Sequence, residues 1–358
     1  MLPLVSAGLS RVPKSARHVP EAVSADLEQW RPLHISHTLS LVSALLELQQ
    51  EFDRQQLHIV SWKGPVLAVL LYGTPSLREA SDLDFLLTAD DLPQILLIAE
   101  QFGYTLLGQN GSAAHNRYTF AHQHEFSFFR SRDNIVLEFH VQIMTARFSF
   151  WQNSQAHLTR AVKTTAPLAG QKFLIEQPED LIVGLCIHAF KHNWDRMKWV
   201  ADIARFLQVY GPQLDWARFI ATLKQGGQQT VVLLGLSLAG TVFDLQLPAP
   251  IVSPLQRSPR VALLAGEIAA HIMSGSTELL PARYRQQLLV ILCPRLQDRI
   301  VYRLRPLLHL EYEDLFISEQ NHMFYFLNYL YRIIRLLRKH GSPRVLSRKA
   351  APVRAARS

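Results

Sequence analysis

The spacing of apolar residues along the chain changes near residue 150. Before it, short segments of alternating or continuously apolar residues are interleaved with segments whose apolar residues recur every three or four positions. After it, nearly all segments have the three-to-four spacing that is typical of helices. The pattern predicts an α/β (α+β) fold, in which a small mixed-sheet core over residues 35–150 is followed by a mostly helical domain over 151–340. Residues 1–34 lack a clear period and are expected to form an irregular lead-in.

Several elements of the core can be placed. A strand ending at Lys63-Gly64 is followed by a helix that begins with Pro65, a position that favours proline. Two antiparallel strands are expected on either side of a turn at 131–133, and strands are not expected beyond about residue 150. In chain order the pattern predicts a helix over 34–55, a strand over 57–64, a helix over 65–73, a loop over 74–80, a strand over 81–88, a helix over 89–104, strands over 117–130 and 134–143, and one long or two consecutive helices over 178–211.

Two carboxylates interrupt the apolar strand over 81–88. In a strand, residues two apart share a face, so Asp82 and Asp84 should lie together while Leu83 and Phe85 point into the core. Two ionised carboxylates side by side repel each other, and removing water increases the cost. A hard cation such as Mg²⁺, which proteins bind through one or two carboxylates together with substrate phosphates, would offset this cost.

A third carboxylate is available on the strand over 134–143. Its alternation places Glu138 and His140 on one face and Leu137 and Phe139 on the other. If this strand lies beside Asp82 and Asp84, Glu138 completes a site for two metal ions. The alternative is an ordinary solvated face with cross-strand charge pairs.

Other residues near this strand suggest an anion site. Gly64 would let the backbone approach a ligand closely, and the N–H groups of the following helix favour phosphate, although Pro65 supplies no N–H. Arg78, four residues before Asp82, is a candidate phosphate ligand, and a solvated loop arginine is the alternative.

Composition and charge narrow the class of protein. With 48% hydrophobic and 18% charged residues among 358, the chain is expected to bury a sizeable core. No apolar run is long enough to span a bilayer, the N-terminus does not resemble a signal peptide, and two cysteines make no disulfide framework, so we expect a cytoplasmic protein. The net charge of +8 is concentrated at the end, because residues 332–358 contain nine Lys or Arg and no Asp or Glu.

The basic tail, residues 341–358, is interpreted as a solvated and disordered end. Binding to RNA or to anionic lipid is the alternative.

The ordered set of motifs resembles a known family. Lys63-Gly64, Tyr72, Arg78, Ser81-Asp82-Leu83-Asp84 and Gly103-Tyr104 follow one another as in the nucleotidyltransferase superfamily of the DNA polymerase beta type, and more narrowly in its uncharacterised "type 5" family. The later segments LEFHVQI and HAFKHNWDRMKWVADIARFL resemble further motifs of that family. The resemblance covers roughly residues 35–245.

The resemblance implies an enzyme, a bacterial-type nucleotidyltransferase. Asp82 and Asp84 would hold Mg²⁺, with two ions expected, and Glu138 would stand in for the third carboxylate that orients or deprotonates an acceptor hydroxyl. Lys63, Gly64, Arg78 and Ser81 would contact the nucleotide. The expected reaction moves a nucleoside monophosphate from a nucleoside triphosphate such as ATP to a hydroxyl of a small molecule, peptide or protein and releases pyrophosphate. Pro65 and Glu138 depart from the superfamily pattern. They motivate one alternative, a degenerate nucleotide- or partner-binding member. A second alternative is an RNA nucleotidyltransferase, with the basic tail holding the RNA.

The helical half contributes candidate contacts. His188 and His192 are four residues apart on one helix face, but no third ligand for a zinc site is visible. We expect His188, Lys191 and His192, together with His140, to line the cleft and contact phosphate or acceptor. The alternative for the helix residues is that they satisfy buried hydrogen bonds. Trp194 and Trp199 are expected to pack between elements rather than to stack on a base.

Overall fold

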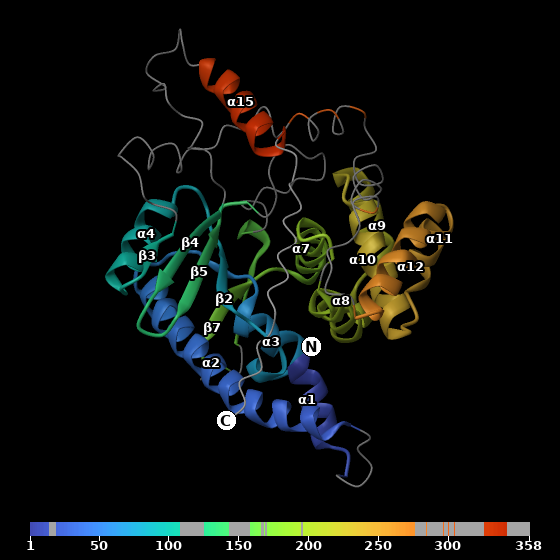
Figure 1. Cartoon of the computed structure of the whole chain (residues 1–358), viewed down its shortest axis with the longest axis horizontal. Helices are drawn as coiled ribbons and strands as arrows, with labels where there is room; N and C mark the ends of the chain where they lie inside the picture. The colour runs from blue at the N-terminus through green and yellow to red at the C-terminus, as the bar shows by residue number, and fades with distance from the viewer. Residues whose placement is uncertain are drawn as a thin grey trace, which may run out of the picture. The chain divides into compact units, whose positions relative to one another are not determined.

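The computed structural model describes residues 1–13, 19–107, 125–142, 158–165, 168, 170–194, 196–275 and 326–341, and the single residues 284, 296, 300 and 304. Compactness divides the chain into two units. The first comprises Met1–Asn110 and Gln123–Arg299, and the second comprises Gly111–His122 and Ile300–Ser358. Figure 1 shows the labelled elements of both.

The described strands form one mixed sheet of seven strands in the order β3-β4-β5-β2-β1-β7-β6. Two neighbouring pairs are parallel, β2 with β5 and β1 with β7, and the others are antiparallel. The sheet confirms the mixed α/β fold class. The strands are β1 Val60–Ser61, β2 Asp82–Leu86, β3 Thr105–Leu106, β4 Glu125–Arg130, β5 Ile135–His140, β6 Val162–Thr165 and β7 Lys172–Ile175.

Helices make up most of the remaining described chain. The N-terminal ones are α1 Leu2–Ser10, α2 Glu21–Arg54, α3 Gly64–Tyr72 and α4 Leu92–Gln101. The later ones are α7 Pro178–Lys191, α8 Met197–Val209, α9 Trp216–Gly226, α10 Gln229–Phe243, α11 Ala249–Gln256, α12 Pro259–Met273 and α15 Leu327–Gly341, and short 3₁₀ turns occupy Pro75–Leu77 and Gly211–Gln213.

Two predictions about regular structure are wrong. The irregular lead-in over 1–34 contains α1 and the first part of α2, because Pro20 precedes the first turn of α2 and Pro32 is accommodated within the helix. Strands also continue beyond residue 150, since β6 and β7 form a hairpin whose second strand pairs with β1. The boundaries at 35–150 and 151–340 stay predictions, and the tail beyond Gly341 lies outside the described residues.

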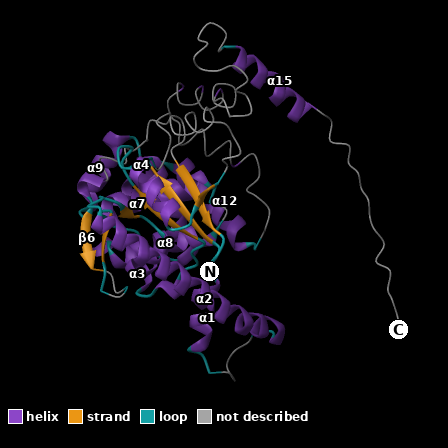
Figure 2. Ribbon diagram, turned by 90° about the vertical axis from the view of Figure 1, so that its left-hand side faces the viewer, coloured by secondary structure: helices purple, strands orange, loops and turns teal. Residues whose placement is uncertain are grey.

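One face of the sheet carries the main hydrophobic core. Leu83 and Phe85 of β2 and Phe139 of β5 are fully buried in a cluster that also contains residues of α2 and α4. Phe52 of α2 meets Phe85 edge to face with ring centroids 5.5 Å apart. Figures 1 and 2 show α2 and α4 beside the strands. Because side chains alternate along a strand, this packing turns the side chains of Asp82 and Asp84 to the other face.

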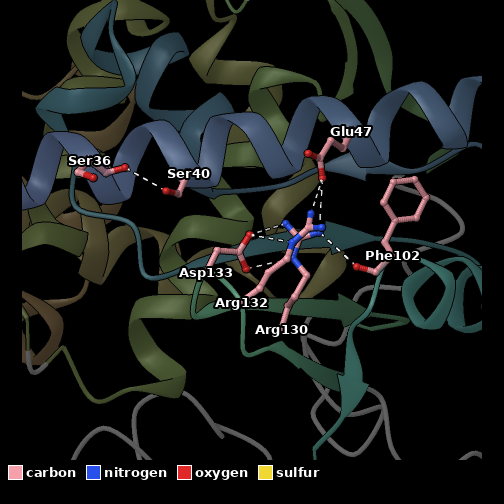
Figure 3. A network of polar contacts seen from close by, with 7 residues as sticks. All are labelled: Ser36, Ser40, Glu47, Phe102, Arg130, Arg132 and Asp133. Carbon is pink, nitrogen blue, oxygen red and sulfur yellow. Dashed lines mark hydrogen bonds and ion pairs between the residues drawn. The ribbon is translucent and has the colours of Figure 1, made fainter.

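Arg130 fastens the hairpin of β4 and β5 to the helices of the core (Figure 3). Its buried guanidinium donates to both carboxylate oxygens of Asp133, at 3.0 and 2.7 Å, and to the backbone oxygen of Phe102 at 3.3 Å. It also forms an ion pair with Glu47 of α2 at 3.4 Å and stacks over the Tyr104 ring. The hairpin that carries Glu138 and His140 is therefore fixed in register against α2 and α4.

Candidate active site

The two strands of the candidate site lie side by side in parallel register. Asp84 of β2 is paired with Glu138 of β5, and Asp82 is paired with Val136. Leu83 and Phe85 are buried in the core, as predicted. The expected arrangement, in which both aspartates share a face with Glu138 beside them, follows from this register.

Asp84 is buried and held by two cationic side chains. Its Oδ1 lies 2.7 Å from Lys63 Nζ and 3.1 Å from His140 Nε2. Burial by itself would raise the pKa of Asp84, but the charge of Lys63 and the hydrogen bond from His140 hold it far below its usual range. Asp84 is therefore a permanently ionised carboxylate whose Oδ1 is fixed from two sides.

A chain of polar contacts continues behind His140. His140 Nδ1 lies 3.5 Å from Glu125 Oε2 on β4, and Lys191 of α7 forms an ion pair with the same carboxylate. Burial would lower the pKa of His140, but hydrogen bonds to Asp84 and Glu138 raise it above its usual value. With both nitrogens facing carboxylates, the imidazole is held as a cation with a fixed ring orientation.

Asp82 is in a different environment from Asp84. It is half-buried, and burial together with the negative charges of Asp84 and Glu138 raises its pKa to about 6. Lys63 and Lys198 of α8 partly offset these effects. Burial and the charge of Arg78, in turn, lower the pKa of Lys198. Asp82 is thus the carboxylate that gains most from an added cation.

The turn at Gly64 lies directly against the aspartate strand. Gly64 has φ +61°, and a Cβ at this position would lie 3.2 Å from the backbone oxygen of Asp82. The backbone N–H of Trp62 donates to the backbone oxygen of Asp84 at 3.0 Å. Both backbone conformation and space favour glycine here. The start of α3 is therefore fixed beside the carboxylates, where the N–H groups of its first turn favour an anion.

The helices α7 and α8 supply the neighbouring wall. Lys63 Nζ lies 3.3 Å from His188 Nδ1, and burial lowers the pKa of His188 well below its usual value. The neutral imidazole therefore accepts a hydrogen bond from the lysine. Trp62, His192 and Trp199 surround the His188 ring at centroid distances of 5.8, 4.7 and 5.3 Å. Trp194 is fully buried, and Trp199 nearly so, which confirms that these indoles pack between elements.

Arg78 is engaged by α8. Its Nε lies 3.0 Å from each carboxylate oxygen of Asp202, and one of these oxygens also accepts from Tyr72 at 3.0 Å. Arg78 and Asp202 are 7% and 1% exposed, so the ion pair is shielded from water. The expected phosphate contact of Arg78 stays a prediction, and the structure gives the residue a second task, which is to join the loop before β2 to α8.

The remaining predicted residues lie at the edge of this cluster. Ser81 is exposed immediately before β2, and Lys191 and His192 are exposed at the end of α7. Glu125, Lys198 and Asp202 were not predicted as site residues. Glu125 carries no signal of its own in the sequence. Lys198 and Asp202 share the four-residue spacing of one helix face.

The donor set suits a divalent cation. Carboxylate oxygens of Asp84 and Glu138 lie within 4.8 Å of each other. His140 completes this group, but as a cation it donates to the carboxylates rather than binding a metal ion. The predicted set contained Asp82 in place of His140, and the register places Asp82 one strand repeat from Asp84 on the same face. Two carboxylates with a third within reach form the kind of oxygen-rich site that Mg²⁺ or Mn²⁺ prefers.

The comparisons with known proteins assign the family. The family model described as "Uncharacterised nucleotidyltransferase" matches residues 1–244. The chain belongs to this nucleotidyltransferase family. It is therefore an enzyme of nucleotidyl transfer, and the resemblance seen in the sequence is confirmed.

Two solved structures show some similarity to the chain, and one of them is described as nucleotidyltransferase-like. The antibiotic-resistance factor ANT(2'')-Ia is 13% identical, with a TM-score of 0.37 over 49% of this chain and 86% of its own. An antigenic nucleotidyltransferase-like protein from Paracoccidioides brasiliensis is 19% identical, with a TM-score of 0.33 over 54% of this chain and 91% of its own. Because both TM-scores are low, the family assignment rests on the family model. No curated protein matches the chain.

Among the residues that the structure describes, no helix is both long and apolar enough to cross a membrane.

Proposed function

We propose that this nucleotidyltransferase uses Mg²⁺ to move a nucleoside monophosphate from a nucleoside triphosphate to a hydroxyl of a small molecule, peptide or protein. The observation that supports the proposal best is the convergence of Asp82 and Asp84 with Glu138 beside the glycine turn at Gly64. Three carboxylates next to a helix N-terminus combine a site for cations with a site for phosphate.

Asp82, Asp84 and Glu138 would hold the metal, and two ions are expected. When bound, the metal neutralises charge on the triphosphate and activates the attacking oxygen. Asp84 enters the reaction already ionised, because Lys63 and His140 stabilise its charge. Its Oδ1 accepts from both, which leaves Oδ2 to face a ligand.

Glu138 would orient or deprotonate the acceptor hydroxyl. It is half-buried, and its carboxylate lies 3.6 Å from His140 Nε2. The carboxylate is thus held on one side by a cation while the other side remains open to an acceptor. Positioning and electrostatic stabilisation account for most of the rate in such reactions, so no nucleophilic side chain is needed.

Lys63, Gly64, Arg78 and Ser81 are the proposed contacts of the triphosphate. Gly64 presents the backbone at the start of α3, while Ser81 lies at the exposed edge of β2. Lys63 lies between Asp84 and His188, and its ammonium would be shared with a phosphate bound at the start of α3.

The wall formed by α7 and α8 is the proposed acceptor side. His188 and Lys191 connect it to the carboxylate face through Lys63 and Glu125. Because these contacts come from the part of the chain that follows the sheet, variation there would change the acceptor without moving the carboxylates.

The test is transfer of label from each of four α-labelled nucleoside triphosphates in the presence of Mg²⁺, with a cell extract as acceptor. The matched control is the Asp82→Asn, Asp84→Asn double variant. Label that moves only with the wild-type chain supports the proposal and identifies donor and acceptor class. Nucleotide binding without transfer would favour a degenerate member, in which Pro65 and Glu138 are the first positions to change. Label found on RNA would favour an RNA nucleotidyltransferase.

A further inference from the structure

The last described helix, α15, has an unusual distribution of side chains. Phe326, just before it, and Leu330, Ile334 and Leu337 recur at intervals of four, four and three, so they share one helix face. They are 57%, 49%, 47% and 66% exposed. A continuous apolar strip about three turns long is therefore open to solvent.

The opposite side of α15 is polar and covered. Asn328 and Arg332, also four residues apart, are 0% and 3% exposed, and both interact with other groups. A surface helix of a globular protein normally buries its apolar face and exposes its polar face. The orientation of α15 is the reverse, so its apolar strip is available to a partner.

The charge of residues 332–358 indicates which kind of partner the apolar strip binds. Residues 332–358 contain nine Lys or Arg and no Asp or Glu, whereas the rest of the chain has 37 − 9 = 28 basic and 29 acidic residues. Leu296, Ile300 and Leu304 repeat the pattern earlier in the chain. They are exposed helical residues at four-residue spacing, and Arg295, Arg299 and Arg303 precede them in the sequence.

We propose that α15 docks this enzyme on the surface of an anionic lipid bilayer, where it lies in the interfacial plane. Phe326, Leu330, Ile334 and Leu337 enter the boundary between headgroups and acyl chains, while the basic residues of 338–358 are attracted to the anionic headgroups. Helices that bind in this way combine a strong apolar face, a polar side rich in Lys and Arg and a low overall hydrophobicity. Each basic residue near such a surface adds to the attraction.

Two other partners, a second copy of α15 and RNA, match the charge and the apolar strip less well than a bilayer does. A second copy of α15 would bring two strongly basic segments together without an acidic partner, and like charges oppose such an interface. RNA would satisfy the basic residues and could stack a base on Phe326, but it would make no use of Leu330, Ile334 and Leu337, because aliphatic side chains offer no ring on which a base can stack. An anionic bilayer is complementary to both the charge and the apolar strip.

The test is sedimentation of the full-length protein with vesicles of phosphatidylcholine that contain phosphatidylglycerol, and with vesicles of phosphatidylcholine alone. The wild-type protein should bind the anionic vesicles more tightly by about tenfold, and added salt should reduce the difference. Two variants separate the contributions, Leu330→Ser/Ile334→Ser/Leu337→Ser for the apolar strip and Arg338→Gln/Lys339→Gln for the charge. The matched control is Leu33→Ser/Leu39→Ser, which removes two exposed leucines of α2.

The triple serine variant should lose about tenfold or more in affinity for anionic vesicles, the charge variant should lose less, and the control variant should bind as the wild type does. Equal binding by the wild type and the triple serine variant would overturn the proposal, as would equal binding to both kinds of vesicle. A wild-type dimer in sedimentation velocity that the triple variant abolishes, without vesicle binding, would assign the strip to a second copy. Loss of RNA affinity in the charge variant alone, again without vesicle binding, would assign the region to RNA.

Discussion

The candidate site has an inner part around Asp84 and an outer part around Asp82. Their surroundings have opposite effects on the ionisation of the two carboxylates. Around Asp84, the side chains of Lys63 and His140 supply positive charge within hydrogen-bond distance. Around Asp82, the largest effects on the pKa come from burial and from the charges of Asp84 and Glu138. All three disfavour the ionised form of Asp82. The same strand therefore carries one carboxylate stabilised by the protein and one that depends on a ligand.

This difference gives Asp84 a role in stability that Asp82 does not have, although both aspartates are proposed to bind the ligand. Removing the charge of Asp84 leaves Lys63 buried without its anionic partner and takes one of three neighbouring carboxylates from His140. Removing the charge of Asp82 relieves repulsion. Both aspartates are proposed metal ligands, so activity alone would not distinguish them, whereas stability would.

The largest effects are expected from the two single variants. Asp82→Asn and Asp84→Asn should each lower nucleotidyl transfer by about 10³-fold. Asp84→Asn should also lower the free energy of unfolding by about 3–5 kcal/mol, because it breaks a buried charge pair, whereas Asp82→Asn should leave the free energy unchanged or raise it. Denaturant unfolding at pH 7 measures both. Equal destabilisation by the two variants would contradict the division into inner and outer parts.

The buried ion pair between Arg78 and Asp202 provides a comparison for the stability effect expected at Asp84. Arg78→Met should lower the free energy of unfolding by about 3–4 kcal/mol, since Asp202 would keep its charge in a buried position. The double variant Arg78→Met/Asp202→Leu should recover much of this loss. If the double variant folds stably but binds nucleotide as the wild type does, by calorimetry, the predicted phosphate contact of Arg78 is wrong.

The raised pKa of Asp82 should make the free energy of unfolding depend on pH. Because the pKa of Asp82 is raised to about 6, the folded chain binds this proton more tightly than the unfolded chain does. Its contribution is therefore largest below about pH 4 and is lost as the pH rises towards 6, with a total of about 2–3 kcal/mol. The difference in free energy of unfolding between metal-free wild type and Asp82→Asn, measured from pH 4 to pH 7, should change in this sense. A flat difference would show that Asp82 is solvated.

The smallest effect is expected at the glycine turn, where a matched pair is available. Gly64 and Gly73 both have positive φ, but only at Gly64 would a Cβ approach other atoms closely. Gly64→Ala and Gly73→Ala should each cost about 1–2 kcal/mol for the left-handed backbone. Gly64→Ala should in addition reduce transfer, because its Cβ presses on the backbone of Asp82. Equal activity of the two variants would show that the turn does not position the aspartate strand.

The local features of this site were accessible from the sequence. Alternation in β2 and β5 correctly assigned Leu83, Phe85, Leu137 and Phe139 to the core, and the motif order around Asp82 indicated the family. Such features depend on residues within a few positions of one another, where the period of a strand determines which side chains share a face.

The contacts across the site were not accessible in the same way. That Lys63 and His140 share one oxygen of Asp84 depends on the register of β1, β2 and β5, which no local pattern specifies. Arg78 had the composition of a phosphate ligand, and only the packing of α8 shows that Asp202 engages it. β6 and β7 were missed because strands of four residues are too short for their period to stand out among helices.

The position of β1 has a consequence for the order in which the protein becomes functional. This strand of two residues lies between β2 and β7, and its parallel neighbour β7 is synthesised more than a hundred residues after it. Parallel pairs form only after a long connection has been closed, and such contacts form slowly. Lys63 directly follows β1, and its positive charge stabilises the ionised carboxylate of Asp84. In an incomplete chain that is still leaving the ribosome, Asp84 would therefore lack its fixed ion pair. Nucleotide chemistry would then begin only after β7 has been synthesised and has paired with β1.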